Sequence, residues 1–97
     1  MSKRRCPVDR LAVRVFRALG DPTRYRIVRL LAQREEVACR ELAKRFPLSA
    51  PALSHHFRVL QECGLLRVRK EGPYHYFRLN RALLDRVLGR WGRWEKG

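Results

Sequence analysis

Polar side chains on one segment of the sequence have types and a spacing that suit hydrogen bonding to the base edges of DNA. Apolar periodicity predicts a helix over residues 50–63. The stripe predicted to face inward consists of Leu53, His56, Phe57 and Leu60. The opposite side presents a hydroxyl, an imidazole and a guanidinium, at Ser54, His55 and Arg58. Such groups bind base edges and phosphates in the major groove, where arginine to guanine is the commonest specific contact.

The start of this segment favours a close approach to nucleic acid. Ser49 is expected to cap the helix, and Pro51 is expected in its first turn. Ala50 and Pro51 are small, so the backbone can approach a groove, and a helix N-terminus favours a phosphate. We therefore predict that this helix contacts double-stranded DNA. The alternative is an ordinary solvated helix face.

The adjacent histidines, His55 and His56, do not predict a metal site. Neighbouring residues on a helix lie about 100° apart, so the two rings cannot easily turn toward one ion. The i,i+4 ligand spacing of helical metal sites is missing as well. His55 is instead expected to face DNA, and His56 to be a partly buried, hydrogen-bonded structural residue.

A second basic region follows, in a segment whose apolar period changes to two. Residues 65–79 alternate on both sides of a turn at Glu71-Gly72-Pro73, which predicts a β-hairpin, or wing. Its basic residues are Arg67, Arg69, Lys70, His75 and Arg78. We expect them to contact the DNA backbone or the minor groove, the alternative being a solvated hairpin. The aromatic residues Tyr74, Tyr76 and Phe77 are expected to pack the wing on the body rather than to stack on single-stranded bases.

Further helices must position these two segments. Helical spacing or capping residues predict them over residues 8–19, from 22 to 33, over 39–46 and after an N-cap at Asn80. The order α-α-α-α-β-β-α is that of a winged helix-turn-helix, mainly α with a small β-hairpin. Residues 1–7 form a basic N-terminal tail, and residues 8–95 form a single DNA-binding domain in this interpretation.

The charge balance points to a polyanionic partner. The 97 residues include 23 Lys and Arg against 9 Asp and Glu, a net charge of +14, and such charge displaces the counterions of nucleic acids. Neither a membrane span nor a secretory signal is expected, so we expect a cytoplasmic protein. No Ser/Cys–His–acid constellation and no glycine-rich phosphate loop suggests an enzyme. A nonspecific architectural protein that binds DNA or RNA by charge alone remains an alternative.

Several segments together resemble the ArsR family of bacterial repressors, over about residues 11–80. They are Leu19-Gly20-Asp21-Pro22-Thr23-Arg24, Glu41-Leu42-Ala43, Leu53-Ser54-His55-His56-Phe57-Arg58-Val59-Leu60, Gly64-Leu65-Leu66, Glu71-Gly72 and Phe77-Arg78-Leu79. The resemblance implies a homodimer joined through its first and last helices. The two recognition helices would enter successive major grooves of a palindromic operator. Family members repress a promoter and release it when a metal ion, an oxidant or another inducer binds.

The metal ligands of the family's sensors are missing from the matching positions. Ala38 and Arg40 fall where arsenic and cadmium sensors carry Cys-x-Cys, and Cys39 falls between them at an inward-facing position. The last helix has only Asp85 and Glu95 and no histidine, so the family's zinc site is also missing. We therefore predict no metal site of either type and no required cofactor.

Three thiols remain as candidate redox residues, at Cys6, Cys39 and Cys63. Cys63 is expected to be a packed small hydrophobic residue. Basic neighbours in the tail are expected to make Cys6 the more reactive thiol. One hypothesis is that Cys6 joins a helix cysteine in a sensing disulfide or a soft-metal site. The alternative is three unconnected cysteines.

Overall fold

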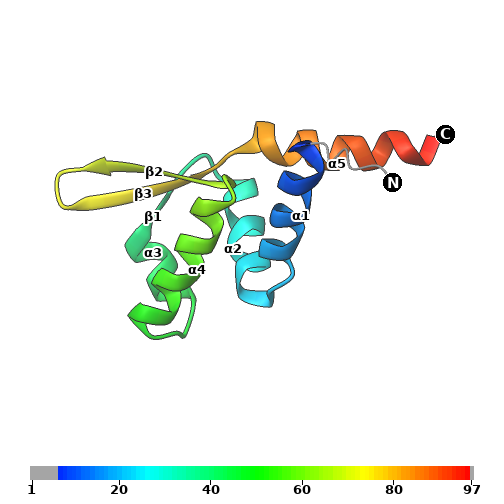
Figure 1. The fold of residues 1–97 in the computed structure, drawn as a ribbon. Helices are drawn as coiled ribbons and strands as arrows, with labels where there is room; N and C mark the ends of the chain where they lie inside the picture. The colour runs from blue at the N-terminus through cyan, green and yellow to red at the C-terminus, as the bar shows by residue number, and fades with distance from the viewer. Residues whose placement is uncertain (1–6, 97) are drawn as a thin grey trace.

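The chain folds as a winged helix-turn-helix. A computed structural model describes the backbone of residues 7–96 and the side chains of residues 10–89 (Figure 1). Its elements, in chain order, are α1 (Pro7–Leu19), α2 (Pro22–Gln33), β1 (Val37–Ala38), α3 (Cys39–Arg45), α4 (Ala50–Glu62), β2 (Leu66–Glu71), β3 (Tyr74–Leu79) and α5 (Arg81–Lys96). The predicted fold class is confirmed, and the boundaries of α1, α3 and α4 differ from the prediction by one residue.

Polar caps set the start of three helices, as the sequence predicts. The Asp21 carboxylate accepts hydrogen bonds from the backbone N–H groups two and three residues further on, at 2.9 and 3.1 Å. The Ser49 hydroxyl accepts the N–H three residues on at 3.3 Å, which begins α4. The Asn80 side chain accepts the N–H three residues on at 3.2 Å and donates to the Gly64 carbonyl at 3.0 Å. Asn80 therefore also ties the start of α5 to the end of α4.

A short strand that the sequence does not predict, β1, completes a three-stranded antiparallel sheet of order β1-β3-β2. Val37 pairs with Phe77, and Ala38 pairs with Tyr76. Two residues are too few to show a period, so only the pairing with a strand about 40 residues away makes this segment a strand. It leads directly into α3.

One hydrophobic core joins every helix to the sheet. The completely buried large residues are Val15, Ile27, Leu31, Val37, Leu42, Leu60, Leu65 and Val87. The Phe57 ring of α4 packs on the Phe77 ring of β3, with 4.6 Å between their centroids. These contacts fix the rotation of α4 about its own axis, and therefore decide which of its side chains reach solvent.

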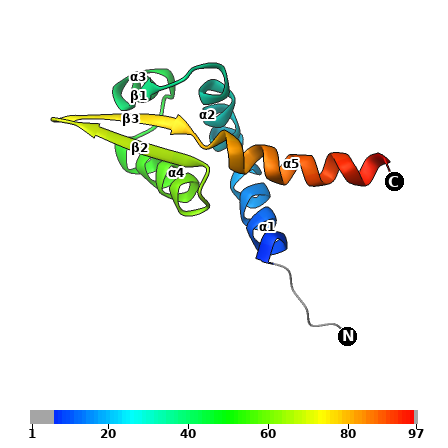
Figure 2. The same ribbon diagram turned by 90° about the horizontal axis from the view of Figure 1, so that it is seen from above.

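The wing and α5 project from opposite sides of the body, as Figure 2 shows. The wing turns at Gly72, whose φ of +60° favours glycine. Beyond Leu66, every residue of β2 is exposed. Among the described residues, no helix combines the length and the apolar character needed to cross a membrane.

Candidate nucleic-acid interface

The exposed face of α4 carries the three side chains predicted to read DNA. Ser54, His55 and Arg58 are exposed, whereas Leu53 and Phe57 are buried. Within the described part of the chain, Arg58 has no hydrogen-bonded or ionic partner, so its guanidinium can bind another molecule without breaking an internal contact. The predicted orientation of the helix is therefore confirmed.

The start of α4 lies at one end of the molecule and is open to solvent. Ser49, Ala50 and Pro51 are all exposed. The turn between α1 and α2 lies at the same end (Figure 1). This end therefore presents small side chains that would not obstruct a helix entering a groove.

His56 positions α4 from the inside, as the structural interpretation of the sequence expects. It is half-buried, and its Nδ1 lies 3.1 Å from an Nη of Arg24 and 3.8 Å from the Asp21 carboxylate. A guanidinium only donates, so Nδ1 accepts this hydrogen bond. Arg24 also donates to the Ala18 carbonyl at 2.8 Å. The α1–α2 junction and α4 are thereby held together. The hydrogen bond from the backbone N–H of Arg24 lowers the pKa of Asp21.

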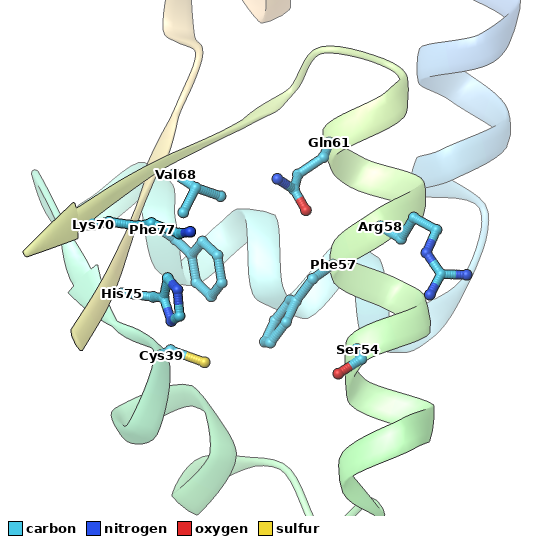
Figure 3. Close-up of a pocket in the computed structure, with 9 residues that line it drawn as sticks. All are labelled: Cys39, Ser54, Phe57, Arg58, Gln61, Val68, Lys70, His75 and Phe77. Carbon is cyan, nitrogen blue, oxygen red and sulfur yellow. The ribbon is translucent and has the colours of Figure 1, made fainter. Parts of the chain in front are cut away.

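A groove separates α4 from the sheet, and we call it the wing groove. Its lining residues are Cys39, Ser54, Phe57, Arg58, Gln61, Val68, Lys70, His75 and Phe77, around a volume of about 400 Å³ (Figure 3). Phe57 and Phe77 point toward each other across its floor, and Cys39 and His75 point into it. Arg58 extends away from the centre. The lining includes cations but no carboxylate, which suits an anionic ligand.

The wing presents its basic side chains in two different states. Arg67, Lys70 and His75 are exposed and have no partner within the described residues. Arg69, by contrast, donates two hydrogen bonds to Glu36, both at 2.9 Å, and one to Glu71 at 2.7 Å. These ion pairs lower the pKa of Glu36 and raise that of Arg69. A phosphate contact by Arg69 stays a prediction, and it would have to compete with two carboxylates.

The aromatic residues of the wing divide between the two faces of the sheet. Phe77 is buried against the body, as expected. Tyr76 is half-buried beneath the guanidinium of Arg69, 4.6 Å from the ring centroid. The expectation that Tyr74 packs the wing on the body is confirmed only in part. Tyr74 is 45% exposed, and its ring meets the body through Arg40 of α3, whose guanidinium lies 4.7 Å from the ring centroid. Strand alternation places Tyr74 and Tyr76 on the face opposite Phe77.

The described thiols lie in different surroundings. Cys63 is buried and donates a weak hydrogen bond to the Leu60 carbonyl at 3.4 Å, which confirms it as a packed small residue. Cys39 is half-buried, and this burial raises the pKa of its thiol. Cys6 lies outside the described residues, so its pairing with another cysteine stays a hypothesis. Between residues 10 and 89 no group of three or more His, Cys, Asp or Glu side chains is arranged to hold a metal ion.

The sequence did not single out the partners that hold the site in place. Glu36 anchors the wing through Arg69, which lies 33 residues further along the chain. Arg24 holds His56 from 32 residues away. Separations of this size leave no periodic or motif signal, although Arg24 does fall within one of the segments that resemble the repressor family.

Comparison with known proteins agrees with this geometry. A family described as a helix-turn-helix domain matches residues 12–69. The arsenical resistance operon repressor of Staphylococcus aureus is 38% identical over 74 residues, which is 76% of this chain and 70% of that protein. The solved ArsR-like transcriptional regulator from Rhodococcus sp. RHA1 is 32% identical, with a TM-score of 0.78 over 94% of this chain and 89% of that chain.

A further solved structure supports the fold alone. It is the homodimeric winged helix-turn-helix DNA-binding domain of a possible ArsR-family regulator from Mycobacterium bovis, determined in solution. It is 23% identical, with a TM-score of 0.72 over 99% of this chain and 92% of that chain. The arrangement of helices and wing is therefore shared even where few residues are identical.

Proposed function

This chain belongs to the ArsR family of winged helix-turn-helix transcriptional regulators, and on that premise we propose that it is a DNA-binding transcriptional repressor. The observation that carries the proposal is the exposed face of α4, which presents Ser54, His55 and Arg58 together. The Arg58 side chain has no partner within the described residues. A helix with this face fits the major groove, which is wide enough to admit one.

The roles of the individual residues follow from their positions. Arg58, at the centre of the exposed face, reads a base edge, and Ser54 and His55 contact bases or phosphates beside it. The small residues at the start of α4, Ala50 and Pro51, let the helix approach closely. On the wing, Arg67, Lys70 and His75 contact the sugar–phosphate backbone, which positions the protein without specifying sequence.

We propose that the repressor acts as a homodimer joined through α1 and α5. Both helices expose apolar side chains: Val13 is 54% exposed and Phe16 is 38% exposed on α1, and Leu88 is 48% exposed on α5. Trp91 and Trp94 follow on α5, and their side chains lie outside the described residues. A two-fold dimer would present two copies of α4 to a palindromic operator.

Fluorescence anisotropy tests the proposal. The reduced protein is titrated into duplex DNA from upstream of its own gene and into a scrambled duplex of the same length, at about 0.15 M salt, a physiological ionic strength. We expect its own upstream DNA to bind at least about 10³-fold more tightly than the scrambled duplex. Equal affinity for the two duplexes would contradict a repressor acting at that promoter and would favour a nonspecific architectural protein.

A further inference from the structure

A second basic groove borders the recognition helix, between α1 and α4. Its charged and polar lining comes from Arg14, Arg17, Arg24, His55 and Glu62, around a volume of about 310 Å³. Three guanidinium groups and an imidazole therefore face a single carboxylate. We call this the α1–α4 groove, and its charge suits an anion.

The cations of this groove differ in how far they are already committed. Arg24 is engaged by the Ala18 carbonyl and by His56. Arg14 donates a long hydrogen bond of 3.4 Å to the backbone carbonyl of Glu62, near the end of α4. The Arg17 side chain is exposed and has no partner within the described residues. Arg17 is therefore the cation most available to an incoming ligand.

The two grooves lie on either side of the exposed ridge of α4. Ser54, Arg58 and Gln61 border the wing groove, at positions i, i+4 and i+7. The α1–α4 groove is bordered by the corresponding triplet His55, Val59 and Glu62. Successive residues of a helix turn by about 100°, so the second triplet lies about 100° around the helix from the first. The ridge between the grooves is the face that reads DNA under the proposed function.

A helix in the major groove lies between two phosphate backbones, one along each wall of a groove about 12 Å wide. The wing groove faces one wall. The α1–α4 groove, on the opposite side of the ridge, then faces the other wall. The end of α1, which carries Arg17, lies on the same side of the molecule as the start of α4 (Figure 1), so Arg17 can reach the DNA that α4 enters. We propose that the α1–α4 groove binds a phosphate of this second backbone, with Arg17 as its principal ligand and His55 and Arg14 beside it. This inference rests on the proposed function.

The salt dependence of binding tests the inference, because each phosphate contact contributes about 0.9 to the slope of log affinity against log salt. The full-length wild type and Arg17→Ala are titrated with its own upstream duplex and with the scrambled duplex, over 0.05–0.2 M salt. The matched control is Arg86→Ala. The Arg86 side chain is exposed and has no partner within the described residues, and its helix, α5, lies away from the start of α4 (Figure 1). Thermal unfolding confirms that all three proteins fold, and Arg17→Gln replaces Arg17→Ala should the latter be unstable.

For Arg17→Ala we expect weaker binding to both duplexes. The slope should be smaller by about 1.8, because the dimer loses one phosphate contact of about 0.9 in each protomer. Over the fourfold rise in salt, the affinity of the variant should therefore fall by a factor about 12-fold smaller than the affinity of the wild type does. Arg86→Ala should keep the wild-type slope. An unchanged slope for Arg17→Ala, or an equal decrease of the slope in both variants, overturns the inference about the α1–α4 groove. The proposed function still stands in that case, provided that the wild type binds its own upstream duplex specifically. A wild type that binds neither duplex overturns both.

Discussion

Replacement of Arg58 by alanine separates base reading from backbone contact on α4. Arg58 is exposed and makes no hydrogen bond or ion pair within the described residues. Its removal should therefore change the free energy of unfolding by no more than about 0.5 kcal/mol, as is usual for surface positions. Any loss of DNA affinity then reports a lost contact with DNA rather than a damaged fold.

The size of the expected loss follows from the kind of contact. A bidentate arginine–guanine pair contributes about 1–3 kcal/mol of discrimination for each protomer of the dimer, which corresponds to about 5- to 150-fold in affinity per half-site. This loss should fall on operator DNA and leave binding to a scrambled duplex nearly unchanged. Arg58→Lys keeps the charge but not the planar fork, so it should bind the scrambled duplex like the wild type and keep only part of the operator preference.

The assay is competition anisotropy of wild type, Arg58→Ala and Arg58→Lys with both duplexes at one salt concentration. Chemical unfolding of the same three samples gives their stabilities. An equal loss of affinity on the two duplexes would show that Arg58 contacts only phosphate. The assignment of the ridge of α4 as the base-reading surface would then fail.

Four further predictions test the core, a cap, the wing and the thiols. Leu60 is completely buried, so Leu60→Ala should lower the free energy of unfolding by about 2–5 kcal/mol in urea titrations. Asp21→Ala should lower the free energy of unfolding by about 0.5–2 kcal/mol at neutral pH. The pKa of Asp21 is lower in the folded protein than in the unfolded chain. The extra stability from its carboxylate is therefore complete above the unfolded pKa, near 4, and should be lost as the pH falls through the folded pKa. Glu36→Gln frees Arg69 from its main partner, so binding to any duplex should tighten and the slope of log affinity against log salt should steepen. An unchanged slope would show that Arg69 does not reach phosphate. Cys6→Ser should leave DNA affinity intact but abolish release by a thiol oxidant, and a retained oxidant response would rule out the Cys6 hypothesis.

The sequence alone predicted most of the helices and their caps because those features depend on neighbours three or four residues away. Asp21, Ser49 and Asn80 each bond a backbone N–H within three residues. The apolar stripe of α4 follows from the helical period, and that stripe already implied which side chains would reach solvent. Net charge and the family resemblance then suggested DNA as the partner.

Tertiary structure alone decided which distant side chains meet. The pairing of β1 with β3, the bond from Arg24 to His56 and the ion pairs from Arg69 to Glu36 join residues more than 30 positions apart. None of these pairs leaves a local pattern, because each forms only when the core brings separate elements together. The same packing sets α1 beside α4, so Arg17, one of 23 basic residues in the sequence, lies next to the recognition helix. Periodicity assigns a side chain to a face of its own helix, but only the packed fold determines what that face lies against.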